Sequence, residues 1–335
     1  MTFNDIWDEF ISNKKIRIKP SSVAIYVQLW MSLKKDFGDM DISSVSTKLV
    51  ERWALGLLSR LSKHAIRDRI MLLNNMIDYY AYEYEVTVNR IQSKYIHWPT
   101  ANIQKGELDN VKTFSPDEIK IMLGKIAEDP RPSRMLIAIM IGSGIRIGEA
   151  CALTYGDINT NDGIIEVKGT VERITIDETY TEKDFNNMNV KLLHRAKKTA
   201  LILSTPKCRA SYRGVPIPRE LLKILKTFKS IYPPAYYIGS NKFKPIEPRI
   251  MRKHYYEFLD ECGIDKKLSP HSLRHTYATT LITSGVDVKT TAALLGHADT
   301  STTLEIYSHA TSESKKKAMT STIGKRFKST FFKLT

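Results

Sequence analysis

The spacing of the apolar residues changes once along this chain, and this change limits the folds that it can adopt. In residues 1–95 apolar side chains recur every three or four positions, as in Ile66, Ile70 and Leu73, which is the period of one helical face. No strand pattern appears there, so we predict a small helical bundle. Its helices are expected from Phe3, after Pro20, over 45–58 and after Ser62.

Residues 99–112 are predicted to form a linker, because they are polar and have no apolar period. A helix then begins, because Ser115 can cap it, Pro116 suits its first position and Glu118 can complete a capping box. A second domain therefore starts at about this point.

The second domain mixes helices with short strands. Strands are predicted at 164–167, 201–203 and 212–217, and the polar segment 170–200 is predicted to be an inserted hairpin or loop. The expected fold is mainly α with a small antiparallel β-sheet. Its parts are a helical domain over 1–98, a mixed α/β domain over 113–310 and a basic tail over 311–335.

The net charge of +15 favours a polyanionic partner, most often nucleic acid. The charge is unevenly distributed. Residues 1–110 carry 15 Lys and Arg against 13 Asp and Glu, whereas residues 191–230 carry 11 against one. The second of these segments is a candidate surface for contact with phosphates.

Other classes of protein fit the sequence poorly. No apolar run approaches the ~20 residues of a membrane-spanning helix, and the polar, acidic start does not match a signal peptide. The 3 cysteines are far apart and form no C-x-x-C, which disfavours a disulfide framework or a zinc site. We expect a cytoplasmic protein with no membrane partner.

Four short clusters in the second domain carry residue types that suit phosphate chemistry. They contain Arg146 with Glu149; Lys207; His271 with Arg274 and His275; and His297, with Tyr307 ten residues later. His271 and Arg274 are three positions apart, so one face of a helix presents both. Each cluster alone is weak, and it is their order that is informative.

These residue types match the needs of DNA cleavage by transesterification. Tyrosine is a poor nucleophile at its usual pKa of about 10, and nearby cations favour its phenolate. Two arginines can hold the non-bridging phosphate oxygens, in contacts that strengthen as charge develops in the transition state. A histidine can transfer the tyrosine proton, and a lysine can protonate the departing oxygen.

The order Arg, Lys, His-x-x-Arg, Gly-His and Tyr resembles the tyrosine recombinases, also called phage-type integrases. The strings H-S-L-R-H-T and L-L-G-H, the second followed by Tyr307, carry the resemblance. It implies a core-site-binding helical domain, a catalytic domain and a recombinase that forms a 3′-phosphotyrosine without metal, ATP or other cofactor. Integration and excision of a mobile element in a bacterial cell is the expected use.

The resemblance implies a catalytic role for six residues and a supporting role for two. The six are Tyr307 as nucleophile, Arg146 and Arg274 as phosphate clamp, His271 as general acid/base, Lys207 as general acid toward the 5′ oxygen, and His297 as a hydrogen-bond donor to the phosphate. The two are Glu149 and His275. Lys197 and Lys198 are rivals for the role of Lys207, and Tyr277 is a rival nucleophile for which packing is favoured.

Six further basic residues are candidates for contact with DNA. They are Lys14, Lys15, Arg17, Lys19, Arg209 and Arg213. For any one residue in the first domain, an ordinary solvated charge is the favoured alternative. The resemblance also implies double-stranded DNA at core sites as the partner, a homotetramer on DNA that assembles from free monomers, and an accessory directionality factor as a further partner to consider. The basic tail is expected to dock on a neighbouring protomer.

Three competing functions are weighed against this one. A metal hydrolase could use His271 and His275, but Ser272 stands where an H-E-x-x-H site has its glutamate. A type IB topoisomerase shares the catalytic set, and the small helical first domain favours a recombinase over it. A non-catalytic DNA-binding regulator would explain the charge but not the ordered catalytic residue types.

Overall fold

A computed structural model of the chain describes residues 1–18, 20–99, 113–176, 185–186, 190–204, 212–266, 268–297 and 299–300. The chain separates into two compact units. The first consists of Met1–Lys105 together with 174–188 and 195–200, and the second consists of the remaining residues.

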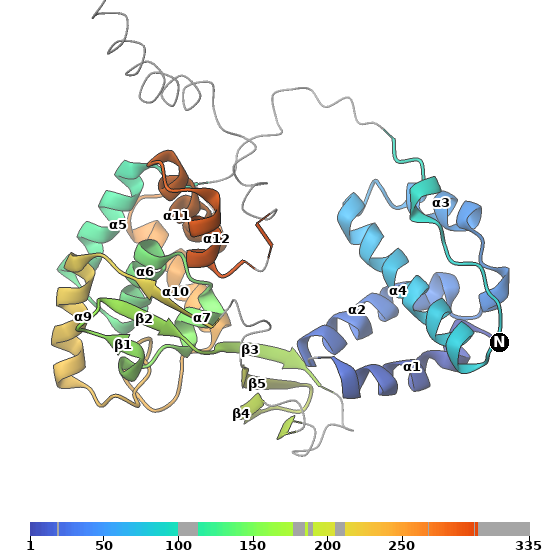
Figure 1. The fold of residues 1–335 in the computed structure, drawn as a ribbon, viewed down its shortest axis with the longest axis horizontal. Helices are drawn as coiled ribbons and strands as arrows, with labels where there is room; N and C mark the ends of the chain where they lie inside the picture. Colours follow the sequence, from blue (N-terminus) through green and yellow to red (C-terminus); the bar gives the residue numbers. More distant parts are fainter. Residues whose placement is uncertain are drawn as a thin grey trace, which may run out of the picture. The chain divides into compact units, whose positions relative to one another are not determined.

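The described residues 1–99 of the first unit are built on four α-helices (Figure 1). They are α1 (Phe3–Arg17), α2 (Pro20–Phe37), α3 (Thr47–Gly56) and α4 (Lys63–Glu83). Ser62 caps α4 by accepting a hydrogen bond from the backbone of Ala65 at 3.2 Å, so the helix expected after Ser62 is present. Short 3₁₀ turns lie at Ile42–Ser44 and Ser93–Tyr95. The helices enclose one apolar core that includes Phe3, Ile6, Phe10, Leu33, Phe37, Ile70 and Leu73.

Helices make up most of the described part of the second unit. They are α5 (Pro116–Glu128), α6 (Pro132–Ser143), α7 (Ile147–Ala152), α9 (Arg219–Ile231), α10 (Pro248–Glu261), α11 (His271–Thr283) and α12 (Val288–Leu295). The capping box expected at Ser115 and Glu118 starts α5. Helix α6 is apolar almost all round, with Met135–Met140 buried, and it packs against α5, α10 and α11.

The described residues also form two three-stranded sheets. In the first, β1 (Ile158–Asn159), β2 (Ile164–Val167) and β6 (Arg213–Pro216) are antiparallel in that order, with Val167 opposite Arg213. The second has the order β3-β5-β4, formed by β3 (Thr170–Thr175), β5 (Thr199–Ser204) and β4 (Val190–Arg195). The prediction of a mainly helical fold with a small antiparallel sheet is confirmed.

The polar segment 170–200 contains β3, β4 and the start of β5, while 177–184 and 187–189 lie outside the described residues. Arg173 on β3 forms a two-pronged ion pair with Glu247 before α10, with Nε–Oε1 and Nη2–Oε2 distances of 2.5 and 2.7 Å.

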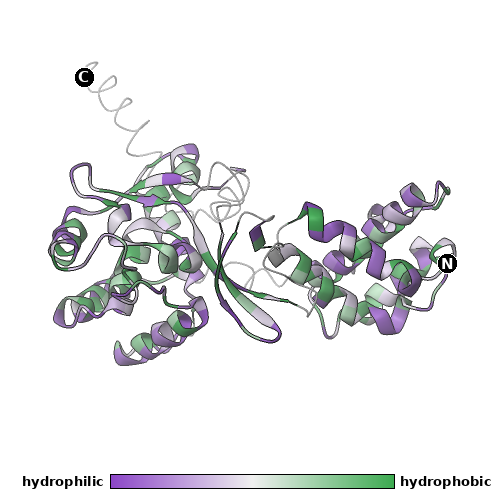
Figure 2. Ribbon diagram, turned by 90° about the horizontal axis from the view of Figure 1, so that it is seen from below, coloured by the Kyte–Doolittle hydropathy of each residue, from purple (hydrophilic) through white to green (hydrophobic). Residues whose placement is uncertain are grey.

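Coloured by hydropathy, the helices carry hydrophobic and hydrophilic sides (Figure 2). In the described part of the chain, no helix combines the length and apolar character needed to cross a membrane.

Candidate active site

The first candidate residue, Arg146, lies in the turn between α6 and α7. Gly144 ends α6 in the left-handed conformation with φ +64°, which glycine adopts without strain. Arg146 precedes α7, and the Glu149 carboxylate accepts a hydrogen bond from its backbone N–H at 2.8 Å and from its Nη1 at 3.0 Å. The Arg146 side chain remains 40% exposed, so its guanidinium can reach a bound oxyanion.

Arg274 is the most enclosed of the candidate residues that the structure describes. It lies on α11 and is 2% exposed. Its Nη1 donates to the Gly144 carbonyl at 2.9 Å, and its Nη2 donates to the Leu295 carbonyl at 2.7 Å. Burial, followed by the charge of Arg146, lowers the pKa of Arg274 to about 9, so the side chain stays charged at pH 7. These contacts bind the end of α6 and the end of α12 to α11.

His271 and His275 lie one turn apart at the start of α11. Their rings meet edge to face, with centroids 4.7 Å apart. Part of His271 is open to solvent, but partial burial and then the charges of His275, Arg274 and Arg146 lower its pKa to about 4. Nδ1 of His275 is buried with no hydrogen-bond partner in the described part of the chain, and burial followed by Arg274 lowers the pKa of His275.

His297 follows directly after Gly296, which ends α12 in the left-handed conformation with φ +69°. Burial, followed by the charges of Arg274 and Arg146, lowers the pKa of His297 to about 4, with further contributions from His271 and Arg213. Residues from α11 and from the ends of α6 and α12 therefore share one electrostatic environment. The structure brings together Arg146, Glu149, His271, Arg274, His275 and His297.

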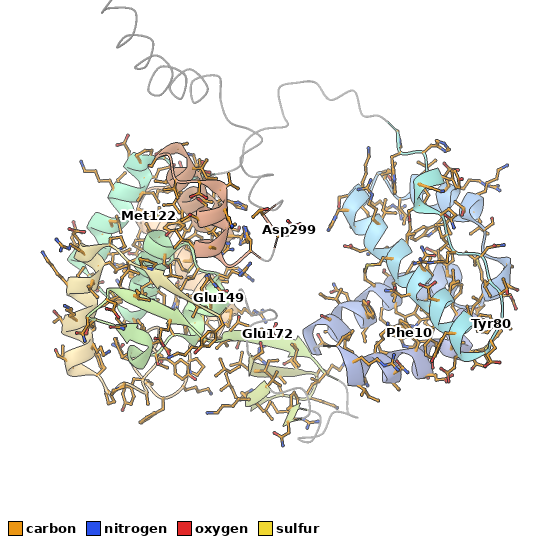
Figure 3. The ribbon with its side chains drawn as sticks, in the orientation of Figure 1. Phe10, Tyr80, Met122, Glu149, Glu172 and Asp299 are labelled. Atoms are coloured by element: carbon orange, nitrogen blue, oxygen red, sulfur yellow. The ribbon has the colours of Figure 1, made fainter. Side chains whose placement is uncertain are left out.

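Glu149, which is labelled in Figure 3, accepts hydrogen bonds from two arginines, Arg146 and Arg213. It is 4% exposed. Arg213 donates to it through Nη1 and Nη2 at 3.3 and 3.2 Å, and Arg213 Nε donates to the Leu294 carbonyl at 2.8 Å. The Arg213 side chain is only 7% exposed. The structure thus places Arg213, a candidate for contact with DNA in the sequence, inside the protein.

Burial opposes ionisation of Glu149, but the hydrogen bonds and charge of Arg213, and then those of Arg146, outweigh it and hold the pKa of Glu149 below its usual value. One carboxylate thus lies among three arginines, with three histidines whose pKa is lowered from its usual value. Such an arrangement can bind a dianionic or monoanionic oxyanion and can accept a proton beside it.

Residues 112–314 match the model of the phage integrase family. This range covers more than half of the chain and includes Tyr307. The chain belongs to the phage integrase family. The family recognised from the catalytic residue order is therefore confirmed, and with it the enzyme class of tyrosine recombinases.

Relatives of this integrase-family chain include a XerC-like tyrosine recombinase of Caldanaerobacter subterraneus subsp. tengcongensis, 29% identical over 84% of this chain and 71% of the relative. Tyrosine recombinase XerA of Pyrococcus furiosus is 28% identical over 62% of this chain and 60% of its own length. A XerC of Thermodesulfovibrio yellowstonii is 27% identical over 52% of this chain and 49% of its own length. The chain thus spans between half and about seven tenths of these relatives.

Solved structures that share the fold include two integrase–DNA complexes. The Tn1549 transposon integrase in complex with transposon right end DNA aligns over 95% of this chain and 98% of its own, with TM-score 0.71 and 19% identity. A lambda integrase dimer bound to a COC′ core site aligns over 91% of this chain and 95% of its own, with TM-score 0.60 and 15% identity.

Some of the candidate residues lie on segments beyond the described part of the chain. Lys207, Tyr307, Arg209 and Lys19 lie outside the described residues, as do 100–112 of the expected linker and the tail over 311–335. Lys14, Lys15 and Arg17 lie on the last turn of α1, where the Lys14 ammonium stands 5.4 Å from the centre of the Phe10 ring.

The rivals considered in the sequence fall in ordinary structural positions. Lys197 and Lys198 are exposed at the turn between β4 and β5. Tyr277 packs its ring against Gly144, where an added Cβ would collide with it. Sequence reasoning missed the backbone carbonyls that hold Arg274 and the internal position of Arg213. The second had a signal, because Arg213 alternates with the buried Val215 and Ile217 on one face of a strand.

Proposed function

We propose that this chain is a site-specific recombinase that cuts and rejoins double-stranded DNA through a 3′-phosphotyrosine at Tyr307. The observation that carries the proposal is the convergence of Arg146, Arg274, His271 and His297 around one region of positive charge. The family match over 112–314 supports the assignment of Tyr307, which follows His297 by ten residues.

In the proposed reaction, Arg146 and Arg274 bind the non-bridging oxygens of the scissile phosphate. The Tyr307 oxygen attacks phosphorus, and the P–O bond to the 5′ oxygen of the next nucleotide breaks. His271, neutral before DNA binds, accepts the phenolic proton, and His297 donates a hydrogen bond to the phosphate. Lys207 donates a proton to the leaving 5′ oxygen. Attack by a 5′ hydroxyl on the phosphotyrosine reverses these steps and rejoins the DNA.

Core recombination sites of a mobile element are the proposed substrate, bound by four protomers that exchange strands. Solved structures with this fold include a transposon integrase with transposon right end DNA and a lambda integrase tetramer bound to a Holliday junction. They support a DNA substrate and tetrameric assembly for this chain. The helical domain over 1–98 is proposed to bind the core site alongside the catalytic domain.

Covalent trapping tests the proposal. The full chain is incubated with nicked duplexes spanning the DNA that flanks its own gene, and the reaction is stopped with detergent. We expect a protein–DNA adduct that migrates above the free protein, forms equally well with EDTA and is lost in Tyr307→Phe. Tyr277→Phe serves as the matched control and should retain the adduct.

The controls separate the alternatives. An adduct that persists in Tyr307→Phe but disappears in Tyr277→Phe would show that the nucleophile is Tyr277 and not Tyr307. Tight binding to these duplexes without any adduct would contradict the recombinase and leave a DNA-binding regulator. Loss of cleavage with EDTA, restored by a divalent metal, would support a metal hydrolase instead.

A further inference from the structure

Arg213 occupies a position that neither a surface DNA contact nor a simple core residue explains. It is the first residue of β6, and its side chain is 7% exposed. All three guanidinium nitrogens donate hydrogen bonds to protein acceptors, two to Glu149 and one to the Leu294 carbonyl. A buried arginine requires such acceptors, since burying an unpaired charge is costly.

The contact with Glu149 leads directly to Arg146. Both Glu149 oxygens accept from Arg213, and the same two oxygens accept from Arg146, one from its side chain and one from its backbone. Glu149 is thereby fixed on one side by Arg213 while it orients Arg146 on the other. Without Arg213, the carboxylate would have Arg146 as its remaining arginine partner and would draw that guanidinium away from a phosphate.

The contact with Leu294 leads to His297. Leu294 and Leu295 are the last two residues of α12, and their carbonyls accept from Arg213 and Arg274 respectively. Carbonyls at the end of a helix have no partner within it, and cations are favoured there. A Cβ on Gly296 would lie 2.8 Å from Nη1 of Arg213, so the guanidinium packs against the residue that precedes His297.

We infer that Arg213 is a positioning residue, which orients Arg146 through Glu149 and holds the end of α12 that presents His297. It acts through these residues and does not touch DNA. The inference rests on the proposed function, because its effect is on DNA cleavage. It also differs from the role as a DNA contact that the sequence suggested.

Two measurements on Arg213→Met separate these roles. The first is the salt dependence of binding to the nicked duplex used for covalent trapping. Log K for DNA binding falls as log salt rises. Removal of an arginine that contacts a phosphate makes this slope shallower by about 1. We expect the slope to be unchanged. The exposed Arg252, on α10 and outside residues 191–230, gives the matched control as Arg252→Met.

The second measurement is the rate of adduct formation by DNA-bound protein. We expect Arg213→Met to reduce it on the order of 100-fold, as for misplacement of catalytic groups by about 1 Å, and Arg252→Met to leave it unchanged. Arg213→Lys should recover part of the rate, because a lysine can pair with Glu149 but cannot also reach the Leu294 carbonyl. If Arg213→Met does not fold, Arg213→Lys is measured by the same criteria.

A double-mutant cycle with Glu149→Gln completes the test. If Arg213 acts through Glu149, the fold-loss of rate in the double variant should be much smaller than the product of the fold-losses in the two single variants. Three outcomes would each overturn the inference. They are a double-variant loss equal to the product of the single losses, a wild-type rate in folded Arg213→Met, and a salt slope that Arg213→Met makes shallower by about 1. A purely structural residue would lower the melting temperature and leave the rate per folded, bound molecule unchanged. A wild-type protein that forms no adduct would instead remove the proposed function, and this inference with it.

Discussion

At the scale of single residues, the site is set to receive a negative charge. The pKa of His271 and of His297 is lowered to about 4, by burial first and then by neighbouring positive charges, which include Arg274 and Arg146 for both. Both imidazoles are therefore neutral at pH 7 in the absence of DNA. A phosphate bound to the arginines would offset their charge and make protonation of either histidine easier.

The pKa values of His271 and His297 are therefore expected to differ between the free and the DNA-bound protein. In the free protein, we expect His271 and His297 to titrate well below 6.5, near pH 4, and to shift upward when a duplex fills the site. Histidine NMR signals, assigned with His271→Gln and His297→Gln, measure both states. Midpoints near 6.5 in the free protein would contradict the electrostatics described here.

The same shift has a consequence for stability. Because the folded pKa lies below the unfolded value of about 6.5, the unfolded chain binds protons more readily as the pH falls. The contribution of the two histidines to the free energy of unfolding is complete above about pH 6.5 and is lost progressively as the pH falls toward 4. The double glutamine variant should therefore lose less unfolding free energy than the wild type between pH 7 and pH 5, as measured by urea denaturation.

At the scale of the elements, the ends of helices build the site, and this decides what the sequence could reveal. The helix starts at Ser62 and Ser115 follow from local capping rules, and the residue order from Arg146 to Tyr307 points to the chemistry. The carbonyl of Gly144, by contrast, receives Arg274 across 130 positions of sequence. Backbone acceptors carry no residue-type signal, so tertiary contacts of this kind cannot be predicted from a single sequence.

Gly144 gives a prediction at this scale. Gly144→Ala would force an L-residue into φ +64° and drive its Cβ into the Tyr277 ring. Left-handed strain of about 1–2 kcal/mol and overpacking of about 1–3 kcal/mol should together lower the free energy of unfolding by about 2–5 kcal/mol. Cleavage should also fall, because the Gly144 carbonyl holds Arg274. Chemical denaturation and the rate of adduct formation measure the two effects.

Gly263, just beyond α10, provides the matched control. Its φ is +68°, but an added Cβ would meet nothing within 4 Å. Gly263→Ala should therefore cost only the backbone strain of about 1–2 kcal/mol and leave the cleavage rate unchanged. Equal losses of unfolding free energy in Gly144→Ala and Gly263→Ala would mean that the collision with Tyr277 adds little to the destabilisation.

At the scale of the whole molecule, charge and chemistry gather in the same part of the chain. Residues 1–110 have 15 basic and 13 acidic side chains, so almost all of the net +15 lies beyond them, as does the family match over 112–314. The sequence predicted one small antiparallel sheet, and the described residues form two three-stranded sheets. The strands β3 and β4 lie in the segment 170–200, for which the sequence left a hairpin or a loop open, because their polar residues obscure the alternation that marks a half-buried strand.

The basic tail supports the last prediction, which concerns assembly. Residues 311–335 carry 7 Lys and Arg and one Glu, and they follow the proposed nucleophile. If the tail docks on a neighbouring protomer, deletion after Ser312 should weaken tetramer formation much more than binding to a single half-site. If it only adds charge near DNA, both should fall together, with a smaller salt slope. Half-site affinity by gel shift and the mass of complexes on full sites by light scattering distinguish the two. Because Tyr307 is retained, the truncated protein should still form the adduct on a half-site, so a selective loss of the tetramer would assign the tail to contacts between protomers.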